Sequence, residues 1–407
     1  MRHRRRLISL VIASLGLVLP FAPPARANTG TGCAKVGQVN KKFDTICSRV
    51  GKKLVWVKVP GKSSSANCPS QVHFTKNFIE PAHVQVVTPI GGQTAFGGSI
   101  AVRSYVHPPS SLYGQQLPLY APTDMTLYQA SYYLPNGAPA DYKPEYSLFF
   151  DAGCSISVQF YHVKGVVGKV ASVVPTTASS SSAGQNVTKT KIAAGEQFGW
   201  YQGEAGRSVA FDFRVEDSAN KNQFINQARF EASPLASGEL FAKCPYDYFI
   251  EPLKSMWLGK LGSSSGVVVP GTPCGKPTQG VNGTVNGMWF LPNAKVNSLT
   301  FDGVPFGDPV VGPAGQYMSQ IALTTDADGT VRIGGLNVAS PLAQMMIFAG
   351  HATWKKPEDV AVGQTHCWAD TRQAVKVQLA SASSLLVAIG SNGCDELSVS
   401  AGRRYER

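Results

Sequence analysis

The side chains best suited to chemistry in this chain are its histidines, because imidazole binds metal ions and exchanges protons near neutral pH. Beyond His3 there are six of them: His73, His83, His107, His162, His351 and His366. None lies two or four residues from another, so the sequence lacks the compact ligand pair of a metal-binding strand or helix. A metalloenzyme would need a site assembled from distant segments.

Other catalytic motifs are weaker still. The sequence contains no Gly-x-Ser-x-Gly elbow and no glycine-rich phosphate loop. Asp326-Ala327-Asp328-Gly329 is similar to the opening of a calcium loop, but no glutamate follows at the distance that bidentate ligation requires. A turn is therefore the favoured interpretation of this segment.

Four segments occur in an order that is typical of one enzyme family. They are Leu119–Leu127, Phe160–Val163, Ala194–Gly199 and Phe211–Phe213. Together they resemble lysostaphin-type (LytM) zinc endopeptidases, whose motifs are Val-Tyr-Ala-Pro-x-x-Gly-x-Val, Tyr-x-His-Leu, x-x-Gly-x-x-Ile-Gly and His-x-His-Phe. The resemblance implies a mainly β protein with an antiparallel β-sheet domain of lysostaphin or duplicated-hybrid-motif type.

Members of this family cut peptidoglycan cross-bridges with one zinc ion, bound by a His, an Asp and the second His of His-x-His. The His of Tyr-x-His and the first His of His-x-His handle protons. An open metal position lowers the pKa of a bound water to about 7 and so creates the nucleophile. Loss of the ligands means loss of that nucleophile.

Most of these residues are replaced in this chain. His162 occupies the Tyr-x-His position, whereas Ala210 and Asp212 stand in place of the two histidines of His-x-His. Upstream, Gly98 and Arg103 align with the remaining His and Asp. Glycine has no side chain and arginine stays protonated, so neither binds zinc. The resemblance therefore implies a catalytically inactive site with no metal and no cofactor.

The residues left at this degenerate site have ordinary interpretations as well. Asp212 is expected on the polar face of a strand, in an ion pair with an arginine or lysine. His162 is either a leftover pocket residue that touches a peptide or sugar, or a surface or half-buried strand histidine. The second interpretation of His162 is favoured.

The elements that position these residues are predicted to be half-buried antiparallel strands. Apolar and polar residues alternate over Ser155–Phe160 and again over Val209–Glu216. Between them, Thr176–Ser182 predicts an exposed loop. Further along, Asp328-Gly329 predicts a hairpin turn, and two segments are predicted as short helices, Pro341–Ala349 and Arg372–Ala380.

The N-terminus predicts export. Four arginines at positions 2 and 4–6 precede the apolar run Leu7–Leu19, and Ala25-Arg26-Ala27 supplies a cleavage site. The run is shorter than the roughly 18 to 20 residues that span a bilayer, and no later segment comes close. We therefore expect a secreted or cell-surface protein without a transmembrane segment after signal cleavage. Its net charge of +12 is spread along the sequence, which argues against a nucleic-acid partner.

All eight cysteines follow the predicted cleavage site: Cys33, Cys47, Cys68, Cys154, Cys244, Cys274, Cys367 and Cys394. An even number in an exported chain predicts up to four disulfides. Cys33 with Cys47 is the most local pair, and Cys367 with Cys394 brackets one C-terminal segment. The other four can pair in three ways, among which the sequence does not choose.

Composition divides the chain into a signal peptide at 1–27, a small Cys/Lys/Trp β module at 28–60, a linker at 61–83, a LytM-like β domain at 84–290 and a β-rich domain at 291–407. The small module resembles one at the start of many exported actinobacterial proteins. Five aromatic residues either line a sugar-stacking surface or close a core around a Cys244–Cys274 bridge: Tyr246, Tyr248, Phe249, Trp289 and Phe290. The core is favoured.

Three functions fit these features. The first is a secreted cell-envelope protein whose inactive peptidase-like domain binds cell-wall peptide or glycan, or an envelope partner. The second is an active zinc endopeptidase of the cell wall with shifted ligands. The third is a non-catalytic adhesion or scaffold protein with no small ligand.

Overall fold

The structure is a computed structural model that describes residues 39–40, 45–50, 53–58, 72–91, 94–95, 98–134, 140–206, 208–233, 236–275, 280–296, 300–301, 304–305, 310–312, 315–337, 345–349, 354–391 and 393–407. The chain forms two compact units, 1–62 and 63–407. The predicted signal peptide and residues 61–71 of the predicted linker lie outside the described residues.

The described part of the first unit consists of three strands, β1 (Val39–Asn40), β2 (Thr45–Val50) and β3 (Lys53–Lys58). They form an antiparallel sheet in the order β1-β2-β3. Cys33 and Cys68 lie outside the described residues, as does the side chain of Cys47. The predicted pairing of Cys33 with Cys47 therefore stays a prediction.

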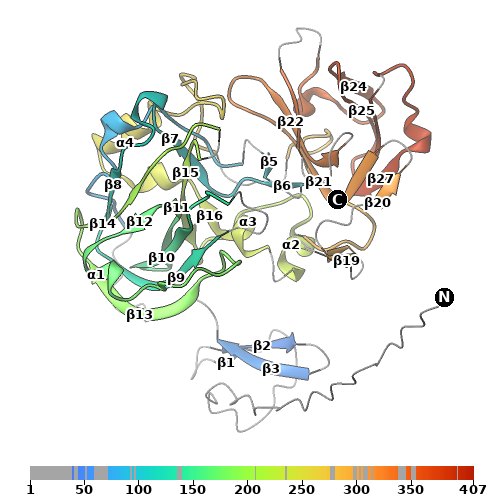
Figure 1. Cartoon of the computed structure of the whole chain (residues 1–407). Helices are drawn as coiled ribbons and strands as arrows, with labels where there is room; N and C mark the ends of the chain where they lie inside the picture. Colours follow the sequence, from blue (N-terminus) through green and yellow to red (C-terminus); the bar gives the residue numbers. More distant parts are fainter. Residues whose placement is uncertain are drawn as a thin grey trace, which may run out of the picture. The chain divides into compact units, whose positions relative to one another are not determined.

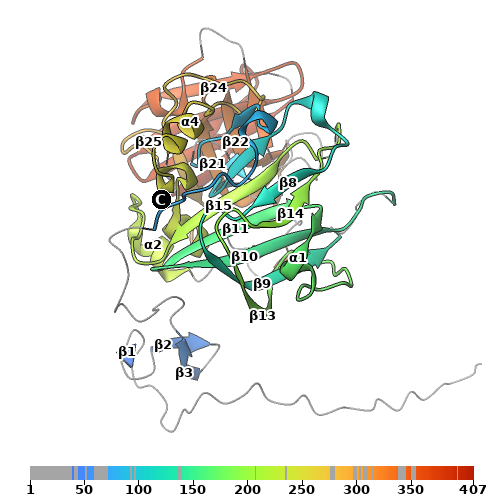
Figure 2. The same ribbon diagram turned by 90° about the vertical axis from the view of Figure 1, so that its left-hand side faces the viewer.

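The second unit contains a large antiparallel sheet with the strand order β13-β9-β10-β11-β15-β7-β4 and with β16 beside β15 (Figure 1 and Figure 2). Its strands are β4 (Val86–Val87), β7 (Ser104–His107), β9 (Met125–Tyr133), β10 (Glu145–Gly153), β11 (Ile156–Val163), β13 (Gln185–Ile192), β15 (Phe211–Asp217) and β16 (Ala242–Lys243). A smaller sheet has the order β12-β14-β8, made of β8 (Leu117–Tyr120), β12 (Gly165–Val166) and β14 (Gln197–Tyr201).

The alternation in the sequence builds the core face of the large sheet. Val158 pairs with Val215 and Phe160 with Phe213 across β11 and β15, so their side chains meet on one face. All four are fully buried. Val209, predicted to open this apolar row, precedes β15 and is 42% exposed. Both predicted strands are thus present, and the second begins two residues later than expected.

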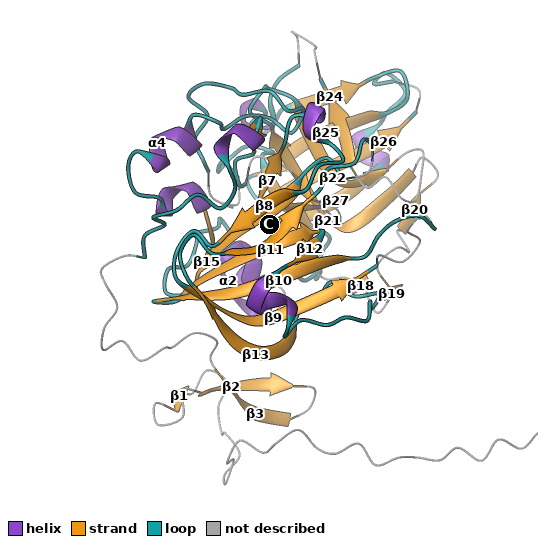
Figure 3. Cartoon of the chain, turned by 60° about the vertical axis from the view of Figure 1, so that its left-hand side comes forward, coloured by secondary structure: helices purple, strands orange, loops and turns teal. Residues whose placement is uncertain are grey.

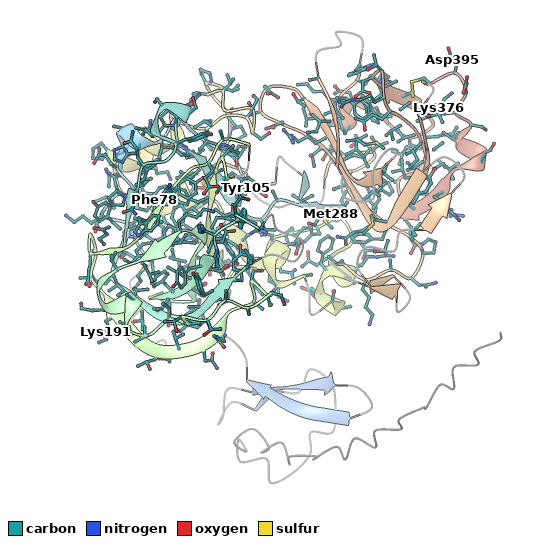
Figure 4. All side chains as sticks on the ribbon, in the orientation of Figure 1. Phe78, Tyr105, Lys191, Met288, Lys376 and Asp395 are labelled. Atoms are coloured by element: carbon teal, nitrogen blue, oxygen red, sulfur yellow. A yellow bond between two sulfur atoms is a disulfide. The ribbon has the colours of Figure 1, made fainter. Side chains whose placement is uncertain are left out.

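Aromatic rings fill the core behind this sheet. Phe78, labelled in Figure 4, stacks on Phe213 with 4.4 Å between ring centroids and lies 4.7 Å from the ring of Trp257. Phe213 also stacks on Phe160 at 5.0 Å. Because each aromatic side chain buries a large apolar area, this cluster supplies much of the stabilisation of the sheet.

Short helices and one-turn segments complete the second unit (Figure 3). They are α1 (Gly168–Ala171), α2 (Gln227–Ala232), α3 (Ser237–Phe241), α4 (Leu253–Leu258) and the 3-10 turns η2 (Pro81–His83), η4 (Ser110–Leu112), η5 (Pro245–Tyr248), η6 (Pro357–Asp359) and η7 (Val399–Ala401). Strands make up 42% of the structure and helices 13%, which confirms the mainly β class.

A second antiparallel sheet follows in the chain, with the order β23-β22-β21-β17-β27-β26-β25-β24 and with β20 beside β21. Its strands are β17 (Gly287–Phe290), β20 (Val310–Gly312), β21 (Gly315–Thr325), β22 (Val331–Asn337), β23 (Met345–Phe348), β24 (Thr365–Ala369), β25 (Ala374–Ser381), β26 (Ser384–Gly390) and β27 (Arg403–Glu406). The predicted turn at Asp328-Gly329 joins β21 to β22 and is confirmed. Two further strand pairs are β5 (Thr94–Ala95) with β6 (Ser99–Ile100) and β18 (Thr300–Phe301) with β19 (Val304–Pro305).

The prediction of two helices in the C-terminal region is wrong. Residues 374–381 form β25, in which Val375, Val377 and Leu379 are buried while Lys376 and Gln378 are half-buried. This alternation has the period of a strand, which outweighs the helix-forming residues in the segment. In the other segment, residues 345–348 form β23, and 341–344 lie outside the described residues.

A third core joins the two large sheets. Phe230 of α2 packs edge-on against Phe290 of β17 with 6.0 Å between ring centroids, and Met288, labelled in Figure 4, belongs to the same buried cluster. Arg229 of α2 donates from Nη2 to Glu406 of β27 at 2.5 Å. Because β17 pairs with β21 and β27, the four residues just before the predicted domain boundary belong to the C-terminal sheet.

Two disulfides lie within the described part of the second unit, Cys244–Cys274 and Cys367–Cys394. The second was predicted, and the first is one of the pairings that the sequence left open. Cys154 is disulfide-bonded as well.

The five aromatic residues predicted to pack in a core are all buried: Tyr246, Tyr248, Phe249, Trp289 and Phe290. The three before residue 250 belong to the same core cluster as the Cys244–Cys274 bridge. Trp289 and Phe290 pack into the cores of the C-terminal sheet and of the joint between the sheets instead.

Candidate functional site

Three of the predicted site residues, Arg103, His162 and Asp212, meet on the second face of the large sheet, opposite the aromatic core. Tyr105 of β7, Asp212 of β15 and Tyr161 of β11 lie in one row across the sheet. Arg103, just before β7, donates from Nη1 to Oδ2 of Asp212 at 2.8 Å. Nε2 of His162 lies 3.6 Å from the same oxygen. The ion pair predicted for Asp212 is therefore present, and its partner is Arg103.

The burial of Asp212 differs from the sequence-based expectation. Its side chain is only 2% exposed, although it lies on the face that was predicted to be polar. A carboxylate removed from water needs a compensating charge, and Arg103 supplies it. Burial lowers the pKa of Arg103, but the negative charge of Asp212, together with Tyr105 and Tyr161, outweighs it and raises that pKa overall.

The other two predicted residues are placed differently. Gly98 has a φ of +74°, and a Cβ atom built on it would lie 2.2 Å from the carbonyl oxygen of Gln320 in β21. This glycine therefore has a packing role against the C-terminal sheet. Ala210 is half-buried just before β15 and contributes no polar atom to the cluster.

Glu145, at the start of β10, was missed in the sequence and is the centre of the site. Its carboxylate is fully buried and accepts hydrogen bonds from Tyr133 at 3.1 Å, from Tyr142 at 3.2 Å and from Lys164 at 2.9 Å. Nδ1 of His162 lies 2.6 Å from Oε1. Burial alone would raise the pKa of Glu145, but the hydrogen bonds and positive charges of His162 and Lys164 outweigh it and lower the pKa to about 2.

The protonation of His162 follows from that of Glu145. A carboxylate only accepts hydrogen bonds, so Nδ1 of His162 carries a hydrogen that it donates to Glu145, and Nε2 is the nitrogen that titrates. Burial opposes a charge on the imidazole, yet the hydrogen bond to Glu145 and the charges of Glu145 and Asp212 raise the pKa of His162 overall. His162 also has a φ of +63°, a left-handed conformation that is uncommon outside glycine and is concentrated at functional sites.

The charges of this cluster are unequally exposed. The carboxylates of Glu145 and Asp212 are 0% and 2% exposed, and the ammonium-bearing side chain of Lys164 is 5% exposed. By contrast, Arg103 is 30% and His162 35% exposed. The cluster therefore presents Arg103 and His162 to solvent and keeps both carboxylates and Lys164 beneath them.

Among the described residues, the other histidines do not complete a metal site. His107 of β7 has a pKa lowered to about 4 by burial, partly offset by the charges of Asp212 and Asp326. Its Nε2 and Oδ1 of Asp212 are both buried and have no hydrogen-bond partner in the part of the chain that the structure describes. Within the described residues, no three His, Cys, Asp or Glu side chains are arranged to hold a metal ion.

Beside the charged cluster, the same sheet face carries a hydrogen-bonded network. Tyr161 donates to Gln159 at 2.6 Å, and Gln159 donates to Glu216 at 3.0 Å, while Arg214 pairs with Glu216. The guanidinium of Arg103 lies over the ring of Tyr161, 4.9 Å from its centroid. These contacts fix the plane and position of Arg103.

Comparisons with known proteins give no family assignment. No protein-family model matches the chain, and no curated protein matches it. Across the described part of the chain, none of the helices has the length and apolar character needed to traverse a bilayer.

Proposed function

We propose that this chain is a secreted cell-envelope protein that binds peptidoglycan without cleaving it. The binding site is the cluster of Arg103, His162, Asp212, Glu145 and Lys164. The lysostaphin-type resemblance gives the ligand class, and the Arg103–Asp212 ion pair explains why cleavage is not expected. A carboxylate that is engaged with a guanidinium at 2.8 Å is a poor zinc ligand, since binding the metal would leave Arg103 without its partner.

One observation carries the proposal. The partly exposed groups of the site, Arg103 and His162, are hydrogen-bond donors with positive or titratable charge, and their buried partners hold them in place. Such a preorganised pair of donors binds a polar, anionic ligand at little entropic cost.

The test uses the chain without its signal peptide, purified and sedimented with insoluble peptidoglycan at physiological salt. We expect the protein in the pellet, no soluble peptide fragments released from the wall, and no stoichiometric zinc in the purified protein. Zinc at one ion per chain together with chelator-sensitive cleavage would replace this proposal with the active endopeptidase. A protein that stays in the supernatant would favour the scaffold function.

A further inference from the structure

We propose that the group recognised at this site is a carboxylate of the cell-wall peptide, held between the guanidinium of Arg103 and Nε2–H of His162. This inference rests on the proposed function and names the ligand group within it.

Arg103 has hydrogen-bonding capacity to spare. Among the described residues, its side chain bonds only to Asp212, through Nη1. Nη2 and Nε remain for a ligand, and a guanidinium edge with two N–H groups matches the two oxygens of a carboxylate. The ring of Tyr161 beneath the guanidinium keeps that edge in a defined orientation.

His162 supplies a second donor close to the first. Its Nδ1 is engaged with Glu145, whereas Nε2 lies 3.6 Å from Oδ2 of Asp212, beyond hydrogen-bond distance. The same oxygen is 2.8 Å from Nη1 of Arg103, so the side chains of Arg103 and His162 meet at the buried carboxylate of Asp212. We infer that a ligand carboxylate accepts from the remaining N–H groups of Arg103 and from Nε2–H of a protonated His162, on the solvent-exposed side of Asp212.

The charges that face His162 come from every strand around it. They belong to Glu145 of β10, Asp212 of β15, Lys164 after β11 and Arg103 before β7. The hydroxyls of Tyr133 and Tyr142 donate to Oε1 of Glu145, the oxygen that His162 also contacts. With His162 protonated, three positive groups face two carboxylates, whereas a neutral His162 balances the charges. The site therefore favours an anion most when His162 is protonated, and the raised pKa of His162 extends that state above pH 6.5.

The decisive comparison needs no variant of the protein. The chain without its signal peptide is sedimented with native peptidoglycan and with the same peptidoglycan after its carboxylates have been converted to neutral amides. We expect binding to the amidated wall to be weaker by about tenfold or more, as for the loss of a charge-assisted hydrogen bond. Equal binding to both walls would overturn this inference and leave the proposed function intact, whereas binding to neither would remove both.

Two variants test whether Arg103 and His162 are the residues that bind the carboxylates of peptidoglycan. His162→Asn removes the charge and tolerates the left-handed backbone, and the double variant Arg103→Gln with Asp212→Asn removes both charges of the pair, so that neither is left buried alone. Each is expected to weaken binding to native peptidoglycan about tenfold. The exposed Lys169→Gln is the control for a lost positive charge and should bind as the wild type does.

The pH profile separates His162 from Arg103. Wild-type binding to native peptidoglycan should decrease as pH rises through the pKa of His162, and the His162→Asn variant should lose this dependence. Wild-type strength in both site variants, or a similar loss in the Lys169→Gln control, would show that the wall is bound elsewhere on the surface.

Discussion

Replacing Glu145 with glutamine tests whether a buried carboxylate organises the site. The variant keeps the size of the side chain and removes its charge. Lys164, only 5% exposed, then has no anionic partner, and the donor Nδ1–H of His162 meets a weaker acceptor. Removing one member of a buried ion pair typically costs about 3–5 kcal/mol. Because the glutamine oxygen can still accept one hydrogen bond, we expect a loss near the lower end, about 3 kcal/mol in the free energy of unfolding.

The assay is urea unfolding at neutral pH, followed by fluorescence. Glu196→Gln is the matched control, because Glu196 also pairs with a lysine at 2.9 Å, but in an exposed site where Lys169 is 59% exposed. Exposed pairs contribute about 0–1 kcal/mol. Adding Lys164→Met to Glu145→Gln should recover part of the loss, since no buried charge is then left alone. If Glu145→Gln and Glu196→Gln lower the free energy of unfolding by the same amount, the carboxylate of Glu145 does not stabilise the buried network.

Three further predictions concern pH dependence, backbone packing and disulfides. Because the pKa of Glu145 is lowered, its contribution to stability is complete above its ordinary value of 4.5 and is lost as pH falls toward 2. Because the pKa of His162 is raised, its contribution is complete below 6.5 and is lost as pH rises through the folded value. The free energy of unfolding measured against pH should therefore be highest between 4.5 and 6.5 and fall on both sides, and a profile that stays level below 4.5 and above 6.5 would contradict the cluster. Gly98→Ala should cost more than about 3 kcal/mol because its Cβ meets a backbone oxygen of β21, while Gly114→Ala, also at positive φ but in open space, should cost only about 1–2 kcal/mol in the same urea assay; equal costs would remove the packing role. The two described disulfides close loops of similar length, with sequence separations of 30 and 27, so replacing either pair with alanines should cost a similar 2–4 kcal/mol, roughly, by thermal or urea unfolding, and very different costs would point to strain rather than loop entropy.

The parts of the fold that follow from local pattern were predictable. Alternation placed Phe160 and Phe213 in the core, and the Asp-Gly turn marked the β21–β22 hairpin. The segment Arg372–Ala380 was predicted as a helix and contains good helix formers, but Val375, Val377 and Leu379 follow the period of a strand.

The sequence alone predicted site residues only at positions that align with the motifs of the lysostaphin-type family. Arg103 and Asp212 were named, and their pairing followed from simple charge complementarity. Glu145 was missed because nothing local marks it. It reaches His162 only through the pairing of β10 with β11, where Tyr146 lies opposite Val163. Gly98 was interpreted only as the replacement of a zinc ligand. Its packing role could not be predicted, because β21, the strand it contacts, is more than two hundred residues away in the sequence.

The most direct test of the account is an NMR titration of the histidine side chains, with imidazole nitrogens labelled, as soluble peptidoglycan fragments are added to the chain without its predicted signal peptide. Binding at the cluster predicts a shift of the His162 Nε2 resonance toward its protonated position, with little change at exposed His73, which lies outside the site. Saturable binding of the fragments with an unchanged His162 signal would contradict the account.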